Sequence, residues 1–409
     1  MYDGERMIGR TKNFASAFIY SEELSNFEYS PTHPFKPIRA KLTLDLCRRY
    51  DLIERPWIRI VKPQPLDFEV LAEFHDESYL KALQAVDSAA MASELWPDTP
   101  APQAGELLTL DPKILEYELG TEENPIFSGV YDYSALAAGA TFLGAKMVAS
   151  GEVQVAFNGV GGFHHAGRDH AEGFCYVNDV AVAITHLLKE GLRVAFVDID
   201  AHHCNGVQDA FYADDRVLVI SLHETGRDLY PWSGFENEIG EGKGRGYTVN
   251  VPLPQKTDDE AFVRAFEEIV PPLLEAYSPD MVIAELGADT HISDPLTHLS
   301  MTNFGYCQAV KKLIERSPRL LALGGGGYDI YKTIRSWTLA WAILNDLEPR
   351  DEYAGIIGGM MFGPEVEVGD LHDKTIFTMG VVKERINREV DRVLEAIKQT
   401  VFPIHHIHK

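Results

Sequence analysis

Short apolar segments recur through the middle of the chain and restrict its fold more than any other feature. They lie at residues 153–157, 193–200, 216–223, 280–289 and 319–323. Their length and their content of Val, Ile and Leu predict strands that are buried on both faces. Helix-like segments separate several of them, at 176–190, 258–277 and 302–316. This alternation predicts an α/β fold with a mainly parallel central sheet and helices on both faces.

No break in composition or charge divides the chain, so we expect a single domain over residues 1–409. Its core should run from about 17 to 345, and 346–409 should form a C-terminal extension that packs on the core. Within this extension, the apolar spacing of 381–399 predicts an amphipathic helix. The Pro-rich, acidic stretch 96–127 is aperiodic and predicts a long loop.

The charge and the cysteines limit the function classes. The chain has 37 basic and 62 acidic residues and a net charge of −25, which argues against a nucleic-acid partner and suits a cationic substrate. Its four cysteines form no C-x-x-C pair, as expected in a reducing compartment. We find no signal peptide and no apolar run of about 20 residues, so we expect a cytoplasmic protein with no membrane partner.

Polar residues with metal-ligand or acid–base chemistry follow the predicted strands. NGVGGFHH follows 153–157, DIDAHH closes 193–200, His223 closes 216–223, Asp289 closes 280–289 and GGGGY follows 319–323. Ligands of open parallel sheets bind beyond the carboxyl ends of the strands. The sequence therefore predicts an active site at this edge of the sheet.

The alternating set Asp198, Asp200 and His202 indicates a cation. Period-2 geometry places the three side chains on one side of a strand, and buried carboxylates are costly unless they are paired. Asp289 could add a further ligand, and three protein ligands with an open position are typical of a catalytic Zn²⁺ site. The alternative is a hydrogen-bonded polar cluster at the edge of the sheet.

Two further motifs carry possible catalytic groups. His164 and His165 follow a Gly-rich turn, and one or both could act as acid and base on a water held by the metal. One of them could instead be a structural histidine. Gly324–Gly327 presents Tyr328 on a flexible turn. A phosphate-binding loop is the rival interpretation, but neither G-K-[ST] nor G-x-G-x-x-G is present.

Together these motifs resemble the zinc-dependent histone deacetylase superfamily. The matching segments are HHAGRDHAEGFCYVNDVAVA (164–183), VDIDAHHCNGVQDAFY (197–212), SLH (221–223), LGADTHISDPL (286–296) and LGGGGY (323–328). HPFKPIR (33–39) and LGTEENPIFSGVYDY (119–133) are most similar to the bacterial acetoin-utilisation deacetylases. The resemblance begins near Ile19 and covers most of the chain, and it implies the arginase/deacetylase fold.

The resemblance also implies a role for each matching residue. The metal ligands would be Asp200, His202 and Asp289. The catalytic set would be His164, His165, Asp198, Asn205 and Tyr328. The substrate-binding set would be Gly173, Phe174 and Tyr230 in the wall of an acyl-lysine tunnel, Leu296 at its rim, and Glu123 on a loop that grips the substrate backbone. One structural K⁺ site would use Asp198, Asp200, His202, Ser221 and Leu222, and a second Phe211, Asp214, Val217 and Tyr247. Arg39 would line a cavity behind the metal.

The motifs depart from the family pattern at Cys204 and Asn205. Many class I members have Gly-Asp at these two positions. Asn205 is more similar to class II enzymes, whereas LGGGGY is similar to class I, so the class assignment is mixed. We expect Cys204 to be an inert buried thiol, since cysteine is a common core residue.

The sequence therefore predicts a zinc-dependent deacetylase, with Fe²⁺ as an alternative metal and K⁺ as a structural ion. It would hydrolyse the linear amide of acetylated (acylated) lysine in a protein or peptide. The alternatives are a hydrolase of acetylpolyamines or other small amides and, from another class, an inactive module that binds acyl-lysine. The sequence does not indicate an oligomeric state.

Overall fold

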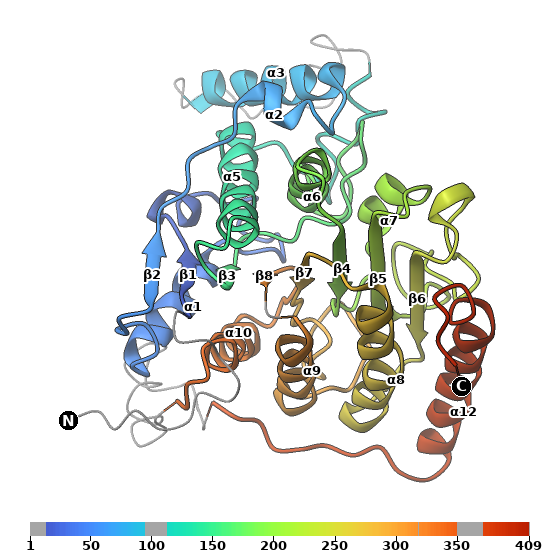
Figure 1. Ribbon diagram of the computed structural model, residues 1–409. Helices are drawn as coiled ribbons and strands as arrows, with labels where there is room; N and C mark the ends of the chain where they lie inside the picture. The colour runs from blue at the N-terminus through green and yellow to red at the C-terminus, as the bar shows by residue number, and fades with distance from the viewer. Residues whose placement is uncertain (1–13, 95–112, 318, 350–370, 409) are drawn as a thin grey trace.

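The centre of the molecule is one sheet in which eight strands run parallel, in the order β2-β1-β3-β8-β7-β4-β5-β6 (Figure 1). The computed structural model describes residues 14–94, 113–317, 319–349 and 371–408. The strands are β1 Ser16–Ile19, β2 Ile58–Val61, β3 Val155–Asn158, β4 Val194–Asp198, β5 Val217–Glu224, β6 Thr248–Leu253, β7 Met281–Glu285 and β8 Leu320–Leu323. The predicted α/β fold with a parallel sheet is confirmed.

The inner strands are buried on both faces, as their apolar composition predicts. Every residue of β3, β4, β7 and β8 is buried. Successive side chains of β4 enter two different cores: Val194 and Phe196 pack on one side of the sheet, and Ala195 and Val197 on the other. The sheet is therefore the middle layer of three.

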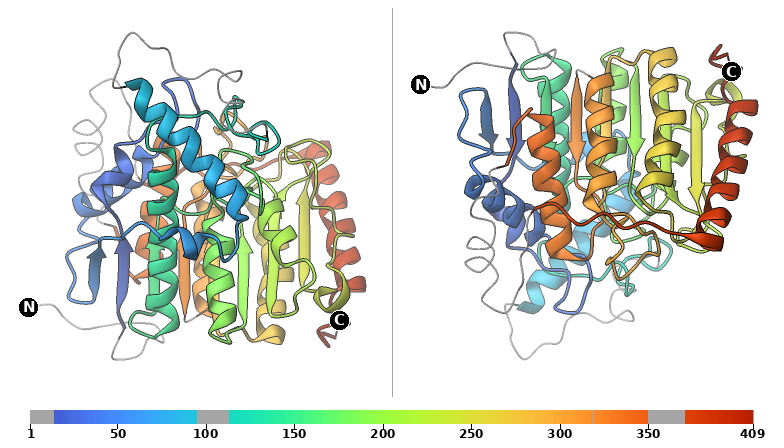
Figure 2. Two further views of the ribbon diagram at one scale, coloured as in Figure 1. Left: turned by 90° about the horizontal axis from the view of Figure 1, so that it is seen from above. Right: turned by 90° about the horizontal axis from the view of Figure 1, so that it is seen from below.

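Helices form the two outer layers (Figure 2). The helices are α1 Ile38–Arg49, α2 Phe68–Leu71, α3 Glu77–Glu94, α5 Val130–Ala149, α6 Asp179–Lys189, α7 Asn205–Phe211, α8 Asp259–Tyr277, α9 Asn303–Arg316, α10 Ile330–Leu344 and α12 Gly380–Thr400, with short 3₁₀ turns at Glu22–Ser25 and Gly242–Gly244. Helices α5, α6 and α7 cover one face, and α8, α9 and α10 cover the other (Figures 1 and 2). Helix α12 packs against α8 and β6.

Side-chain caps fix where several of these helices begin. Asn178 accepts the backbone N–H of Ala181 at the start of α6, and Asp258 does the same for Ala261 at the start of α8. Each cap satisfies a backbone donor that the first helical turn leaves free. These helices therefore begin close to the predicted positions 176 and 258.

The predicted elements correspond to observed ones where the apolar pattern is strong. The apolar runs became β3, β4, β5, β7 and β8, and the predicted helices became α6, α8, α9 and α12. In the predicted loop 96–127, residues 113–127 form turns, bends and irregular backbone without a helix or strand, and 96–112 lie outside the described residues. No helix in the described ranges is long and apolar enough to cross a membrane.

The order of the strands places the site. β3, β8, β7 and β4 are consecutive neighbours, although they are far apart in sequence. Their carboxyl ends lead into the loops that carry His164, Tyr328, Asp289 and Asp200. Because the strands are parallel, these loops leave the same edge of the sheet.

Candidate active site

Asp200, His202 and Asp289 form a buried group that could hold one metal ion. One ligand atom from each lies within 4.8 Å of the other two. Nδ1 of His202 lies 2.9 Å from Oδ2 of Asp289 and 3.1 Å from Oδ1 of Asp200. One imidazole nitrogen and two carboxylates are ligands that Zn²⁺ accepts, so the donor set fits a zinc ion.

Backbone amides hold the two carboxylates in position. Gly326 N–H donates to Oδ2 of Asp200 at 2.6 Å, and Ala201 N–H donates to Oδ1 of Asp289 at 2.8 Å. The glycine loop can approach so closely only because it lacks side chains: a Cβ at Gly326 would lie 2.2 Å from Oδ2 of Asp289. The GGGGY motif therefore shapes the metal group from one side.

His164 and His165 contact each other beside this group. Their Nε2 atoms lie 3.0 Å apart, and Nδ1 of His164 lies 2.8 Å from Oδ2 of Asp198. Burial lowers the pKa of His164 to about 4. Burial, followed by the neighbouring His164 and His202, lowers the pKa of His165 well below its ordinary value. A buried His165 is therefore a neutral base near pH 7.

A hydrogen-bonded chain leads from His165 to the surface. Nδ1 of His165 lies 2.7 Å from Oδ1 of Asn205, and Nδ2 of Asn205 donates to Glu172 at 2.8 Å. Glu172 also accepts from the hydroxyl of Tyr230 at 2.9 Å and pairs with His170 at 3.4 Å. Glu172 and His170 were not predicted as site residues, although both lie within the HHAGRDHAEGF motif.

Glu285 is a third residue of the site that was not predicted from the sequence. It ends β7, is fully buried, and neither carboxyl oxygen has a hydrogen-bond partner, although Oε1 lies 3.1 Å from Nδ1 of His164. Burial raises its pKa well above the ordinary value, and the charges of Asp198 and Asp200 raise it further. An acidic residue inside the apolar run 280–289 was the available signal.

Tyr328 lies at the end of the glycine loop and faces the metal group. Its N–H donates to Asp294 at 2.7 Å, and its ring centre lies 6.3 Å from that of His202 and 5.8 Å from that of Phe174. Burial raises the pKa of its phenol well above the ordinary value, and Asp289 and Asp200 add to the effect. The phenol is therefore a neutral hydrogen-bond donor.

A narrow cavity of about 20 Å³ joins these groups. Its lining includes His164, His165, Gly173, Phe174, Asp200 and Tyr328. The ring centre of Tyr230 lies 5.4 Å from that of His165. The lining of this cavity does not include Leu296, which donates its N–H to Asp294 at 2.9 Å. Glu123 lines a larger neighbouring cavity instead.

Arg39 lies under the glycine loop. Its guanidinium donates to the carbonyl oxygens of Gly327 at 2.6 Å and Gly325 at 3.1 Å. It also lies over the rings of Phe35 and Trp337, at 4.6 and 5.0 Å from their centres. This buried cation therefore supports the loop that carries Tyr328.

The residues expected at the potassium sites lie along β4, β5 and their flanks. Asp198 pairs in register with Ser221, which Leu222 follows in β5. In the second set, Asp214 N–H donates to the carbonyl of Phe211 at 3.0 Å, and the carbonyl of Tyr247 accepts from Val219 at 2.8 Å. Val217, the remaining member of that set, begins β5.

Two side chains in this region, those of Asp214 and Cys204, have surroundings that limit what they can bind or react with. The carboxylate of Asp214 pairs with Arg216, so only its backbone oxygen could serve an ion. The Cys204 thiol is buried, and burial together with the charge of Asp198 raises its pKa well above the ordinary value. Its burial agrees with the prediction, and a raised pKa lowers the thiolate fraction on which reactivity depends.

The chain is similar to known proteins along most of its length. The histone deacetylase domain model matches residues 33–344. Histone deacetylase B of Dictyostelium discoideum is 34% identical, over 85% of this chain and 77% of that protein. The acetoin utilization protein AcuC of Bacillus subtilis is 36% identical, over 82% of this chain and 84% of that protein. The resemblance to acetoin-utilisation deacetylases is thus confirmed.

Solved structures are similar to this chain in both fold and sequence. A crystal structure of a histone deacetylase homologue from Aquifex aeolicus has a TM-score of 0.80 and 31% identity, and the match covers 94% of this chain and all of the other. The strand order, the ligand-bearing loops and these similarities lead to one assignment. The chain belongs to the histone deacetylase family and is a deacetylase, a hydrolase of linear amides.

Proposed function

We propose that this deacetylase removes acetyl (acyl) groups from the side-chain amine of lysine in proteins or peptides, with Zn²⁺ as its catalytic metal. One observation carries the proposal: Asp200, the tandem histidines and Tyr328 line a single narrow cavity. A metal group, a base and an oxyanion donor around one point are the components that amide hydrolysis requires.

Asp200, His202 and Asp289 would hold the zinc ion. When bound, Zn²⁺ polarises the amide carbonyl and acidifies water. Fe²⁺ is the alternative, because nitrogen and carboxylate ligands also suit iron. A structural K⁺ would lie at Asp198 and Ser221 with backbone oxygens of Asp200, His202 and Leu222. A second would use backbone oxygens of Phe211, Asp214, Val217 and Tyr247.

The hydrogen bonds of the histidines indicate separate roles. Asn205 presents its oxygen to Nδ1 of His165, since its nitrogen donates to Glu172. Nδ1 of His165 therefore carries the hydrogen, and Nε2 is the basic atom that takes the proton of the attacking water. His164, whose Nδ1 lies 2.8 Å from Oδ2 of Asp198, would be the electrostatic partner of this base and is the candidate proton donor to the leaving amine.

Tyr328 would donate its phenolic hydrogen to the oxygen of the amide as negative charge develops there. One such donor is typically worth ~3–4 kcal/mol of transition-state stabilisation. The phenol has to stay protonated for this role, and its raised pKa agrees. Arg39 would hold the glycine loop, and so the position of this hydroxyl.

The acyl-lysine side chain would pass between Gly173, Phe174 and Tyr230. Any side chain at position 173 would collide with His165, because a Cβ there would lie 2.5 Å from the ring of His165. Glycine therefore allows the wall to lie close to this histidine. Leu296 would lie at the rim. Glu123 would accept hydrogen bonds from backbone amides of a bound peptide.

The alternative substrate is an acetylpolyamine or another small amide, and a module that binds acyl-lysine without hydrolysis is less favoured. A panel of acetyl-lysine peptides and acetylated polyamines at matched concentration separates these functions. We expect release of acetate and the highest kcat/KM on the peptides. If only the acetylated polyamines are hydrolysed, the substrate is a polyamine and not a peptide. Binding of these compounds without any hydrolysis would contradict a hydrolase.

A further inference from the structure

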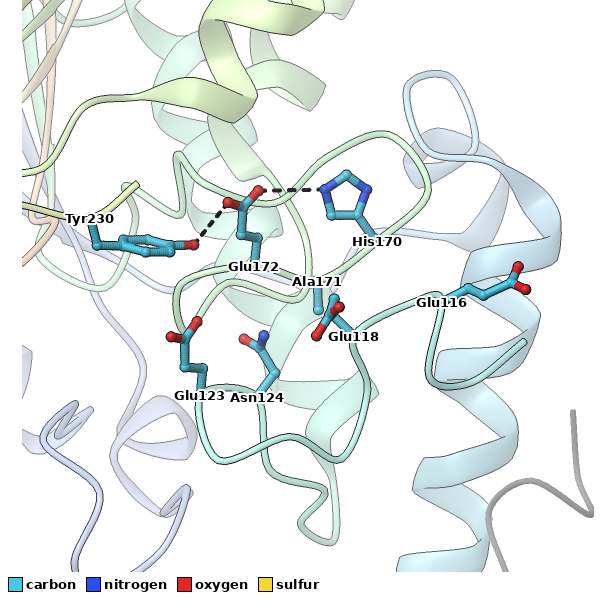
Figure 3. A pocket seen from close by; sticks show the side chains of 8 residues that line it. All are labelled: Glu116, Glu118, Glu123, Asn124, His170, Ala171, Glu172 and Tyr230. Carbon is cyan, nitrogen blue, oxygen red and sulfur yellow. Dashed lines mark hydrogen bonds and ion pairs between the residues drawn. The ribbon is translucent and has the colours of Figure 1, made fainter. Parts of the chain in front are cut away.

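A second, larger cavity adjoins the tunnel. Its volume is about 490 Å³, and it is lined by Glu116, Glu118, Glu123, Asn124, His170, Ala171, Glu172 and Tyr230 (Figure 3). Two loops, 116–124 and 170–172, form most of its wall, and Tyr230 completes it. The two loops are hydrogen-bonded to each other where Ala171 N–H donates to the carbonyl of Tyr117 at 3.0 Å. Glu172 and Tyr230 also belong to the hydrogen-bonded chain that ends at His165, so this cavity lies beside the catalytic histidines.

Most charged groups of this cavity are acidic. Figure 3 shows Glu172 held between His170 and Tyr230, whereas the carboxylates of Glu118 and Glu123 lie apart from any basic side chain drawn there. Among the described residues, no Lys, Arg or His forms an ion pair with Glu118 or Glu123 within 4.0 Å. Burial raises the pKa of Glu123, and the negative charges of Glu172 and Glu118 raise it further. A cation in the cavity would relieve this repulsion.

Asn124 supplies an independent sign of a ligand. Its side chain is 1% exposed, and its Oδ1 has no hydrogen-bond partner. Figure 3 shows this side chain pointing from its loop into the space between Glu123 and Glu118. A buried carbonyl oxygen without a donor is costly. It would be satisfied by an N–H group bound in the cavity.

We propose that this cavity, here called the acidic subsite, binds a second cationic group of the substrate, an ammonium or guanidinium that flanks the acetylated amine. The proposal rests on the deacetylase function above and narrows its substrate class. Among the described residues, the lining carboxylates without an ion pair are those of Glu116, Glu118 and Glu123, and the buried amide oxygen of Asn124 has no donor. Such a set selects an N–H donor with positive charge and disfavours neutral or acidic flanks.

The cation could come from a basic residue beside acetyl-lysine or from the second amine of an acetylated polyamine. The test compares kcat/KM at low salt for acetyl-lysine peptides with Ala, Lys or Glu flanks, and for an acetylated diamine against an acetylated triamine. The variants are Glu118→Gln, the double variant Glu118→Gln/Glu123→Gln, and the control Glu190→Gln. Glu190 is exposed and follows α6 at the opposite edge of the sheet.

We expect the wild type to prefer the Lys flank or the triamine. Glu118→Gln should reduce this preference about threefold and the double variant about tenfold, with both effects lost near 0.5 M salt. Glu190→Gln should preserve it. Whichever substrate series responds identifies the source of the cation. An unchanged preference in the double variant, or an equal change in Glu190→Gln, would overturn the subsite.

A binding measurement separates this proposal from the proposed function. Calorimetric titration of the same proteins with free spermidine, a linear triamine, needs no turnover. Weaker binding in Glu118→Gln than in Glu190→Gln supports the subsite even if no substrate is hydrolysed. Peptides could be deacetylated while Glu118→Gln changes neither the binding of the triamine nor the preference for a flank. That result would support the deacetylase function and contradict the acidic subsite.

Discussion

Nδ1 of His165 lies 2.7 Å from the side-chain oxygen of Asn205. The partner of the proposed base is therefore a neutral amide, which orients the imidazole without stabilising its protonated form. Burial keeps the pKa of His165 well below its ordinary value. The pH dependence of the enzyme should follow from this pair.

Asn205→Asp should move the acidic limb of the kcat/KM profile to higher pH. A carboxylate beside His165 stabilises the imidazolium and raises its pKa, so the base is lost at a higher pH than in the wild type. We expect a shift of up to about one unit, since one unit is ~1.4 kcal/mol. The measurement is a pH–rate profile on one acetyl-lysine peptide at fixed ionic strength.

Glu172 is the control for this variant. Its carboxylate lies 2.8 Å from the side-chain nitrogen of Asn205, and two carboxylates at that distance resist ionising together. The double variant Asn205→Asp/Glu172→Gln should therefore show a larger shift than Asn205→Asp alone. A limb that stays in place or moves down, with the metal retained, would exclude His165 as the titrating base.

Tyr328→Phe should lower kcat by ~10²-fold or more with little change in KM. The hydroxyl is expected to act on the developing oxyanion and not on the ground-state substrate. Steady-state kinetics on the same peptide checks this. Tyr212→Phe, which removes a tyrosine hydroxyl outside the site, is the control. A large rise in KM at unchanged kcat would make Tyr328 a substrate-positioning residue.

Glu123→Ala should harm a neutral-flanked acetyl-lysine peptide more than a compact acetylated amine, because only the peptide has backbone amides to grip. Losing hydrogen bonds to a charged acceptor should reduce kcat/KM on the peptide about tenfold. The neutral flank separates this role from the acidic subsite. Equal losses on both substrates would show that Glu123 does not bind the peptide backbone.

His170→Gln should destabilise the protein in a pH-dependent way. Hydrogen bonding to Glu172, opposed by burial and aided by Asp169, raises the pKa of His170 to about 9. The stabilisation is therefore complete below the unfolded pKa of about 6.5 and is lost as pH rises through 9. His170 is 36% exposed, and solvent screening reduces the expected effect to about 1 kcal/mol.

Urea unfolding of wild type and His170→Gln at pH 6 and pH 10 measures this difference. The two unfolding free energies should differ at pH 6 and converge at pH 10. A constant difference at both values would indicate packing or a neutral hydrogen bond instead of the charged pair with Glu172.

The sequence predicted the inner strands because their apolar runs are continuous. It missed the edge strands β2 and β6 and the short β1. Strand β2 (IRIV) carries a charged, exposed residue, and β6 (TVNVPL) contains a polar residue and a proline, so neither has the pattern of a strand buried on both faces. Their membership of the sheet depends on neighbours that are distant in sequence.

At the site, too, local sequence patterns predicted some residues, whereas contacts between distant segments determine others. Polar residues at strand ends predicted the region where Asp200, Asp289 and Tyr328 meet, because parallel strands share one carboxyl edge. Glu172, Glu285 and the cavity beside Asn124 could not be predicted in that way. Their roles arise from contacts between loops, and no local spacing encodes those contacts.

Metal content and rate, measured on the same preparation, test the central claim most directly. Purified wild type, Asp289→Ala and the exposed-residue control Asp215→Ala would be analysed for metal and assayed on an acetyl-lysine peptide before chelation, after it, and after return of Zn²⁺ or Fe²⁺. We predict one catalytic metal per chain, loss of deacetylation with the metal and recovery on its return, in wild type and control but not in Asp289→Ala. Full activity after exhaustive chelation, or an active Asp289→Ala without metal, would contradict the account.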